Sequence, residues 1–196
     1  MGANGRKRLE RPARFCTQLL AVALALCPPA LAQDLPTLLG TVTRVLDADT
    51  ADVQLSSGSI RVRFNGIDAP ERNQPMGHEA TAALTKLIGG KQVQVEPFQQ
   101  DKYDRMIGNV FVGGVNVNEE LVKQGYAWAY RKYLKRETAN LCDLEDAARQ
   151  ARRGIWSLPA SDWIAPWDWR HLKTRADPTD YSHETAALCR AAIGRH

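Results

Sequence analysis

Three short stretches of this 196-residue chain carry residue types that together could hydrolyse a phosphodiester. Residues 47–50 and 62–71 contain aspartates suited to a hard cation and one glutamate, and arginines stand in residues 62–71 and 101–105. Cleavage of a phosphate diester requires a group that activates water and positive charge that stabilises the transition state. The three stretches supply both, so they predict a site that cleaves phosphodiesters.

Asp49 and Asp68 are the candidate ligands for a divalent cation. Both stand at the ends of predicted strands that a meander would bring side by side, and carboxylate oxygens are ligands that Ca²⁺ and Mg²⁺ prefer. An EF-hand loop that began at Asp47 would have Ala51 at its fifth position and Gly58 at its twelfth, where a glutamate is required. That type of calcium site is therefore excluded. The alternative for Asp49 is an ordinary turn residue.

Glu71, Arg63 and Arg105 are the candidate groups for the chemistry itself. Glu71 follows Pro70, whose restricted backbone would hold the next carboxylate in one direction, as a general base requires. The guanidinium groups of Arg63 and Arg105 match phosphate oxygens with two donors and stay charged in a cleft. The alternatives are a solvated loop glutamate and arginines that form surface salt bridges.

The elements that must position these residues follow from the pattern of apolar residues. Alternating patterns predict five strands, the first three as a meander. The strands cover residues 41–46, 51–55, 60–64, 92–97 and 107–112. A stripe with a period of 3.6 residues predicts a helix over residues 77–88, which Gly89 and Gly90 would end. Five strands with a helix after the third predict an α+β fold built on a five-stranded OB-type barrel.

Two further helices are predicted after the last strand, which makes about three in all. A short helix over residues 119–124 would be capped by Asn118. A longer amphipathic helix over residues 140–153 would bury Leu141, Leu144, Ala148 and Ala151.

The first 32 residues have the pattern of a cleaved secretory signal peptide. Basic residues precede an apolar run at 19–26, and small residues stand at 30–32. The run is too short to span a bilayer comfortably. We therefore expect a protein exported to the periplasm or the medium, with no membrane insertion after cleavage. The alternatives are a retained membrane anchor and a lipid attached at Cys27.

The charge balance excludes one class of nucleic-acid-binding protein. The first 32 residues hold five of the 26 Lys and Arg residues and one of the 22 Asp and Glu residues, so the remainder carries 21 of each. The sequence pI of about 9.0 therefore reflects the targeting segment. A protein that coats DNA through a broad basic surface is not expected, and attraction of a polyanion must come from local groups and a bound cation.

Residues 38–158 form the predicted barrel domain, and residues 159–196 form a tail with a different composition. Trp163, Trp167 and Trp169 are crowded together in this tail. The rings could stack on bases. The favoured interpretation is a tail that folds against the barrel with these rings as packing anchors.

Cys142 and Cys189 are the two cysteines that remain after residue 32. In an exported protein, two remaining cysteines more often pair than stay reduced. We therefore expect a disulfide that ties the tail to the last helix of the domain. Two unrelated thiols are the alternative.

Five blocks of the sequence resemble, in order and spacing, the signature blocks of the thermonuclease (staphylococcal nuclease) family. The blocks are residues 45–50, 63–71, 101–105, 117–125 and 151–156. The resemblance implies an OB-fold phosphodiesterase that depends on Ca²⁺, with Mg²⁺ or Mn²⁺ as alternatives, and acts on DNA and RNA with little sequence preference. By matching position, it implies that Asp49, Asp68 and the backbone carbonyl of Ala69 bind the calcium ion.

The same resemblance implies roles for the three catalytic candidates. Arg63 and Arg105 would bind the scissile phosphate and stabilise the transition state, and Glu71 would act through the attacking water. A non-catalytic OB binding module and a metal-stabilised envelope protein are the rival interpretations. Such modules usually lose a catalytic arginine or the glutamate, and this chain keeps all three.

The resemblance also implies where nucleotides bind. Lys102 and Tyr103 match positions that contact nucleotide phosphate and base or sugar, and a second stacking tyrosine is Tyr130 or Tyr133. Asp104 replaces the glycine that the family usually has before the second arginine, so it adds a negative charge near the phosphate site. DNA and RNA, preferentially single-stranded or frayed, are the expected partners of a monomeric protein.

Overall fold

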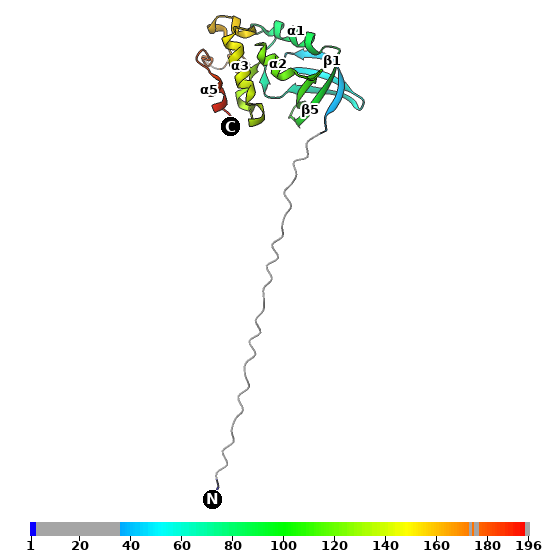
Figure 1. Cartoon of the computed structure of the whole chain (residues 1–196), viewed down its shortest axis with the longest axis vertical. Helices are drawn as coiled ribbons and strands as arrows, with labels where there is room; N and C mark the ends of the chain where they lie inside the picture. Colours follow the sequence, from blue (N-terminus) through cyan, green and yellow to red (C-terminus); the bar gives the residue numbers. More distant parts are fainter. Residues whose placement is uncertain (3–35, 173, 175–176, 195–196) are drawn as a thin grey trace. The chain divides into compact units, whose positions relative to one another are not determined.

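Five strands form a closed barrel that carries the rest of the fold (Figure 1). The structure, a computed structural model, describes residues 1–2, 36–172, 174 and 177–194. The barrel strands are β1 (Leu38–Asp47), β2 (Thr50–Leu55), β3 (Gly58–Phe64), β5 (Gln92–Gln100) and β6 (Met106–Val112). They pair in the order β3-β2-β1-β5-β6, and a parallel pairing of β3 with β6 closes the barrel. The predicted α+β fold with a five-stranded OB-type barrel is confirmed.

The chain divides into two units, Met1–Gln33 and Asp34–His196, and the barrel belongs to the second. The predicted signal peptide, residues 1–32, lies outside the described residues except for residues 1 and 2. In the part of the chain that the structure describes, every helix is too short or too polar to cross a membrane.

Alternation of apolar and polar residues determines which side of each strand faces the barrel core. In β3, Val62 and Phe64 are buried, while Arg63 between them points to the other side. Two register shifts in β1, between Val42 and Arg44 and again before its end, bend this long strand. Because β1 is bent, it can pair with both β2 and β5 in the closed barrel.

Helix α1 (Gly77–Ile88) has the predicted bounds and covers the barrel with Ala80, Leu84 and Ile88. It ends where the prediction places its glycines, and Gly90 adopts a φ of 68°, which glycine tolerates best. Gly77 packs directly on the loop before the helix, because a Cβ atom at this position would lie 2.0 Å from the carbonyl oxygen of Glu71.

Helix α2 (Val117–Lys123) begins earlier than predicted, and Asn118 is not its cap. The side chain of Asn116 accepts the capping hydrogen bond instead. Asn118 is 2% exposed, and its amide donates to the carbonyl oxygens of Asn65 and Gly108. It therefore joins the ends of β3 and β6, where the barrel closes.

Helix α3 (Asn140–Gln150) is shorter than the predicted helix over residues 140–153. The chain turns at Arg152, which has a φ of 50°, and Ala151 is exposed instead of buried as predicted. Leu144 is half-buried. The helix packs against α2, which in turn contacts β6.

A buried ion network joins α3 to the neighbouring short strand. Glu145 is 1% exposed and accepts hydrogen bonds from Arg131, Arg149 and the backbone N–H of Ala129. Arg131 also pairs with Glu184 in the C-terminal segment. The network compensates the charge of a carboxylate that water does not reach.

Several short elements have no counterpart in the predicted pattern. Strand β4 (Ile67–Asp68) pairs with β8 (Trp128–Ala129), and β7 (Val115–Asn116) extends the barrel sheet beside β6. Single 3₁₀ turns cover Arg131–Tyr133, Arg136–Thr138, Gly154–Ser157 and Ala160–Asp162. The β4–β8 pair matters most for the site, because it fixes the backbone of Asp68.

The C-terminal segment folds against the domain through its aromatic rings. It contains α4 (Pro166–Trp169) and α5 (Ala186–Ala191). Trp163 and Trp167 pack against a second buried cluster that is centred on two other tryptophans, Trp128 and Trp156. Trp163 and Trp167 are therefore packing anchors, as the favoured interpretation has it, whereas Trp169 lies outside this cluster and donates to Asn73. A disulfide joins Cys142 on α3 to Cys189 on α5.

Candidate active site

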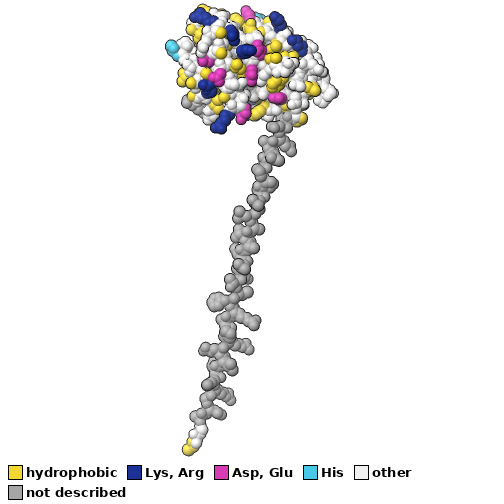
Figure 2. Space-filling model, in the orientation of Figure 1, with side chains coloured by type: hydrophobic (Ala, Val, Ile, Leu, Met, Phe, Trp, Pro, Cys, Tyr) yellow, Lys and Arg dark blue, Asp and Glu magenta, His cyan; other side chains and the backbone are white. Residues whose placement is uncertain are grey.

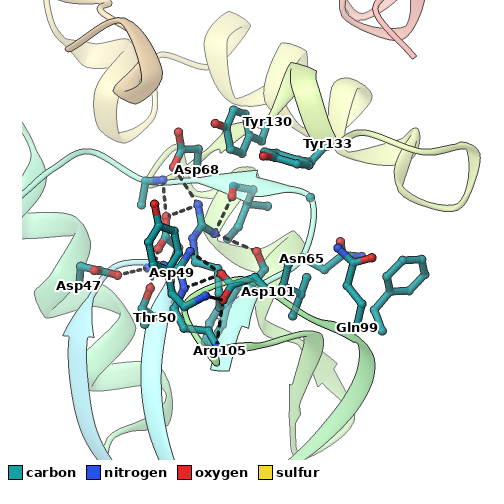
Figure 3. Close-up of a pocket in the computed structure, with 18 of the residues that line it drawn as sticks. Asp47, Asp49, Thr50, Asn65, Asp68, Gln99, Asp101, Arg105, Tyr130 and Tyr133 are labelled. Atoms are coloured by element: carbon teal, nitrogen blue, oxygen red, sulfur yellow. Dashed lines mark hydrogen bonds and ion pairs between the residues drawn. The ribbon is translucent and has the colours of Figure 1, made fainter. Parts of the chain in front are cut away.

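One pocket of about 790 Å³ collects residues from all three chemistry-bearing stretches (Figure 3). The cation and catalytic candidates that line it are Asp49, Arg63, Asp68, Ala69, Glu71 and Arg105. The nucleotide-contact candidates that line it are Lys102, Tyr103, Tyr130 and Tyr133. Every predicted site residue except the two disulfide cysteines therefore lies on the wall of a single pocket at one end of the barrel.

Asp49 and Asp68 converge on one point. Asp49 lies in the turn between β1 and β2, and Asp68 lies in β4. One nitrogen of Arg63, Nη2, is 3.0 Å from Asp49 Oδ2 and 2.8 Å from Asp68 Oδ1. The backbone N–H of Ala69 donates to Asp49 Oδ2 at 2.9 Å, so the backbone of Ala69 lies beside both carboxylates. The two carboxylates and the backbone N–H of Ala69 are thus neighbours.

The donor set fits a hard divalent cation. Two buried carboxylates and a nearby backbone carbonyl are oxygen ligands of the kind that Ca²⁺ and Mg²⁺ use. Among the described residues, no group of three or more His, Cys, Asp and Glu side chains has a metal-binding arrangement. A cation at Asp49 and Asp68 would therefore need the carbonyl of Ala69 and water to complete its coordination.

The electrostatics of this end of the pocket also favour a cation. Burial, followed by the charge of Asp49, raises the pKa of Asp68 to about 6, although Arg63 and Arg170 act in the opposite direction. Burial and the same Asp49 charge raise the pKa of Asp47 to about 7. Carboxylates that repel one another in a buried position gain from an added positive charge. Asp47, Asp49 and Asp68 therefore form an acidic cluster whose members repel one another.

Arg63 is held rigidly by four oxygen atoms. Its Nη1 donates to the carbonyl oxygens of Phe64 and Ile67 at 2.9 and 2.8 Å, and its Nη2 donates to Asp68 at 2.8 Å and forms an ion pair with Asp49 at 3.0 Å. The side chain is 13% exposed. These contacts hold the guanidinium in one orientation and engage both terminal nitrogens, so a phosphate would bind at Nε or replace some of these oxygen partners.

Arg105 reaches the pocket from the loop between β5 and β6. Asp101 holds it in place, with Oδ2 at 2.8 Å from Nε and 2.7 Å from Nη2. The other oxygen of Asp101 accepts the backbone N–H groups of Tyr103 and Arg105. Burial by itself raises the pKa of Asp101, but the hydrogen bonds from Arg105 and Tyr103 outweigh it and lower this pKa. Asp101 therefore stays charged and organises the whole loop.

Asp104 occupies a backbone conformation that glycine adopts more readily than other residues. Its φ is 60°, in the left-handed region, which aspartate enters more readily than most residues. The substitution keeps the loop shape, and the side chain of Asp104 is exposed.

Glu71 is aimed at the pocket by the loop between β4 and α1. Its backbone N–H donates to the side chain of Gln74, and its backbone carbonyl accepts from the N–H of Gln74. Its side chain is 39% exposed, and Oε1 accepts a hydrogen bond from Arg170 at 2.7 Å. A carboxylate with this exposure and a fixed backbone can contact a water molecule in the pocket.

Arg170 is a member of the site that the sequence pattern does not predict. Its Nη2 lies 2.6 Å from Asp68 Oδ2, and its Nη1 lies 2.7 Å from Glu71 Oε1 and 3.3 Å from Asp68 Oδ1. It stands in the tail, about one hundred positions after both partners and outside the five family-like blocks. No local periodicity or motif marks such a residue, so no sequence signal could have identified it.

The aromatic residues line the more open part of the pocket. Tyr103 is 67% exposed, and the Lys102 ammonium lies 5.0 Å from its ring centroid. Tyr133 is 50% exposed, whereas one face of the Tyr130 ring is stacked on Trp167 with centroids 5.2 Å apart. Of the two tyrosine candidates, which lie side by side in Figure 3, Tyr133 has the more accessible ring.

Phe98 and Lys135 also line this part of the pocket and have no counterpart in the prediction. Phe98 is 46% exposed, and the Lys135 ammonium lies 3.7 Å from its ring centroid. Basic and acidic side chains are intermingled on the face of the described residues that Figure 2 shows. On this face, therefore, no uniformly basic surface is available to attract a polyanion.

Comparison with known proteins gives a consistent result. Residues 61–158, half of the chain, match the family described as staphylococcal nuclease homologue. The chain is 43% identical over 135 residues to an "Uncharacterized endonuclease" of Escherichia coli O157:H7, which covers 68% of this chain and 86% of that protein. It is 40% identical over 146 residues to a "Micrococcal nuclease" of Shigella flexneri, with coverage of 70% and 83%. It is 37% identical over 156 residues to "Protein ParB" of Escherichia coli, with coverage of 75% and 85%.

Proposed function

Since the chain belongs to the staphylococcal nuclease family and is therefore a hydrolase that acts on nucleic acids, we propose that it is an exported, Ca²⁺-dependent nuclease that cleaves DNA and RNA with little sequence preference. One observation carries this proposal. The two aspartates, the two arginines and the glutamate that such a reaction needs all line one pocket.

In this proposal the phosphate is bound by Arg63 and Arg105. The guanidinium groups approach the pocket from β3 and from the loop before β6, and both stay charged because each is paired with a carboxylate. Their donors stabilise the additional negative charge that develops on the phosphate oxygens in the transition state. Arg105 is the more exposed of the two, with 30% of its side chain accessible.

Glu71 acts as the general base. Its exposed carboxylate accepts a proton from the water that attacks the phosphorus atom. The turn that Gln74 closes keeps the carboxylate on the pocket side.

Asp49, Asp68 and the carbonyl of Ala69 are the residues that would hold the cation. When bound, a divalent ion neutralises phosphate charge and polarises the phosphorus–oxygen bonds. Ca²⁺ is the proposed ion because it accepts irregular sets of carboxylate, carbonyl and water oxygens, whereas Mg²⁺ demands a nearly regular octahedron.

We propose that the substrate is nucleic acid with unpaired bases. Tyr103 and Tyr133 offer exposed rings on which a base can stack, and Lys102 lies close enough to Tyr103 to contact a phosphate. A base inside a duplex is not available for such stacking, so single-stranded or frayed nucleic acid is preferred. The signal-like pattern of residues 1–32 and the disulfide support export, and we propose a monomer.

Cleavage of labelled single-stranded DNA and RNA by protein purified from an exporting host tests the proposal. We expect cleavage with Ca²⁺, loss of cleavage with a chelator and recovery when Ca²⁺ is restored. Mass spectrometry of the purified protein should find an N-terminus at Gln33. Binding without cleavage would instead support a non-catalytic OB module, and cleavage that is indifferent to the chelator would exclude the cation role.

A further inference from the structure

The C-terminal segment inserts one side chain, Arg170, between two residues of the proposed site. The guanidinium spans Asp68 and Glu71, with one nitrogen 2.6 Å from Asp68 Oδ2 and the other 2.7 Å from Glu71 Oε1. Asp68 is 1% exposed and Glu71 is much more accessible. One planar group therefore connects a buried carboxylate of the proposed cation site to the proposed general base.

The backbone around Arg170 is fastened to the loop that carries Glu71. The amide of Gln74 donates to the carbonyl oxygen of Ile164 at 2.6 Å, and the indole N–H of Trp169 donates to Asn73 Oδ1 at 3.3 Å. Arg170 itself follows directly on α4. Two independent hydrogen bonds thus join the same pair of segments that Arg170 bridges.

The other side of α4 contacts Tyr130 of the domain and residues 179 and 181 of the C-terminal segment. Trp167 stacks on Tyr130 with an angle of 6° between the rings, and its indole N–H donates to Tyr181. Asp168, which is 3% exposed, accepts the backbone N–H of Thr179. Because α4 is held on both sides, the start of the Arg170 side chain has a defined position.

We propose that Arg170 is a positioning residue of the nuclease: it holds the Glu71 carboxylate at a fixed distance from Asp68, so that the general base faces the attacking water. This inference rests on the proposed function. Arg63 is shared between Asp68 and Asp49, at 2.8 and 3.0 Å, so Arg170 also contributes to the charge balance of Asp68. Beyond this, Arg170 adds the link to Glu71, whose carboxylate would otherwise sample several rotamers.

The geometry separates this role from that of a simple counter-charge. The link uses both terminal nitrogens of a planar fork: Nη2 donates to Asp68, and Nη1 donates to Glu71 at 2.7 Å and to Asp68 at 3.3 Å. A lysine at this position would keep the charge but has one nitrogen atom and cannot reproduce the two directions. Arg170→Lys and Arg170→Gln should therefore behave alike.

The test compares Arg170→Gln and Arg170→Lys with a control from the same segment, Arg190→Gln. Arg190 pairs with Asp143 on α3 and does not line the pocket. We expect kcat to fall by about 10- to 100-fold in both Arg170 variants, the range typical of lost orienting partners, with KM little changed. The control should keep the kcat of the parent.

A chemical rescue and a structure add readouts that a merely structural role would not change. Arg170→Gly leaves a space that a guanidinium ion can enter from solvent, because the arginine side chain is 37% exposed. Guanidinium should restore part of kcat in this variant, whereas NaCl at the same ionic strength should not. A crystal structure of Arg170→Gln should show the Glu71 carboxylate in a changed or divided orientation and Asp68 still on Arg63.

Four results would overturn the inference. They are an Arg170→Gln variant as active as the parent or more active, full recovery in Arg170→Lys, an equal loss in Arg190→Gln, and an unmoved Glu71 in the variant structure. If the parent itself cleaves no nucleic acid, the proposed function fails and this inference fails with it. If the parent cleaves normally and the Arg170 variants match it, the positioning role alone fails.

Discussion

At the scale of single residues, the site is organised by pairs of opposite charge that restrict one another. Arg63 bridges Asp49 and Asp68, Asp101 holds Arg105, and Arg170 holds Glu71. Such pairing leaves little freedom to lose when a substrate binds, which is the condition for strong electrostatic stabilisation of a transition state. The ion pairs therefore fix the orientation of the catalytic side chains as well as balance their charges.

Glu71→Gln tests the general base. The amide keeps the size of the side chain and an oxygen that can accept from Arg170, but it cannot take a proton from water. We expect kcat to fall by about 10²- to 10⁴-fold with little change in the urea midpoint. Glu79→Gln, on the exposed face of α1, is the matched control and should retain full turnover. A Glu71→Gln variant with near-normal turnover would remove this residue from the mechanism.

Asp47→Asn tests the repulsion inside the acidic cluster. Burial and the charge of Asp49 raise the pKa of Asp47 to about 7. The folded protein thus binds this proton more tightly than the unfolded chain does. Protonation of Asp47 therefore stabilises the folded state; this stabilisation is complete below pH 3.8 and is lost as the pH rises to about 7. Asp47→Asn should therefore match the parent at low pH and exceed its free energy of unfolding at pH 8.

Urea unfolding of chelator-treated protein at pH 4, 6 and 8 measures the effect of Asp47→Asn. Asp162→Asn, at an exposed position, is the control. If the difference between Asp47→Asn and the parent stays the same at all three pH values, Asp47 does not carry the proposed shift.

At the scale of elements, short contacts between neighbouring segments set the direction of each catalytic side chain. The β4–β8 pair fixes Asp68, and the loop between β4 and α1 presents Glu71. The start of α1 packs so closely on this loop that Gly77 has no room for a side chain. Helix α1 therefore helps to fix the position of the loop that carries Glu71, the proposed general base.

Gly77→Ala tests this support. Its new Cβ atom would lie 2.0 Å from the carbonyl oxygen of Glu71 and 3.1 Å from Arg72 Cα, so one of the two segments must move. We expect a loss of about 1–3 kcal/mol or more in the free energy of unfolding, measured with urea, together with reduced kcat.

The control for this helix contact is Gly113→Ala. Gly113 has a φ of 55°, and a Cβ atom added there would have no heavy atom within 4 Å, so the substitution introduces backbone strain without a clash. It should cost about 1–2 kcal/mol and leave kcat unchanged. Equal kcat in Gly77→Ala and the parent would show that α1 does not support Glu71.

At the scale of the whole molecule, the C-terminal segment is part of the domain and of its site. Figure 1 shows this segment beside α3, with α2 between α3 and the barrel. The disulfide fastens α5 to α3, while α4 carries Arg170 into the pocket. The C-terminal segment thus has two roles. Its disulfide at α5 contributes to stability, and Arg170 contributes to the geometry of the pocket.

Replacement of both disulfide cysteines by alanine tests the stabilising part of this arrangement. The bond joins residues 47 positions apart, and the chain-entropy estimate for such a loop is up to about 4 kcal/mol. We expect a lower urea midpoint in Cys142→Ala/Cys189→Ala, and turnover near that of the parent at temperatures where the variant is folded. An unchanged midpoint would show that the disulfide contributes nothing to stability.

The sequence by itself determined the parts of this protein that depend on local patterns. Alternation and the 3.6-residue stripe predict the barrel strands and the bounds of α1, because the side chains that define them are near neighbours in the chain. The acidic, basic and glutamate candidates were also predictable, since they stand in three short stretches at strand ends and in loops.

Tertiary structure decided what local patterns cannot encode. Arg170 meets Asp68 across 102 positions of sequence, and β4 meets β8 only after the chain has folded. Asn118 joins two strands although its sequence position resembles a helix cap, and α3 ends before its apolar stripe does. Each of these features results from packing between segments that are distant in the sequence. The pattern of neighbouring residues therefore does not predict it.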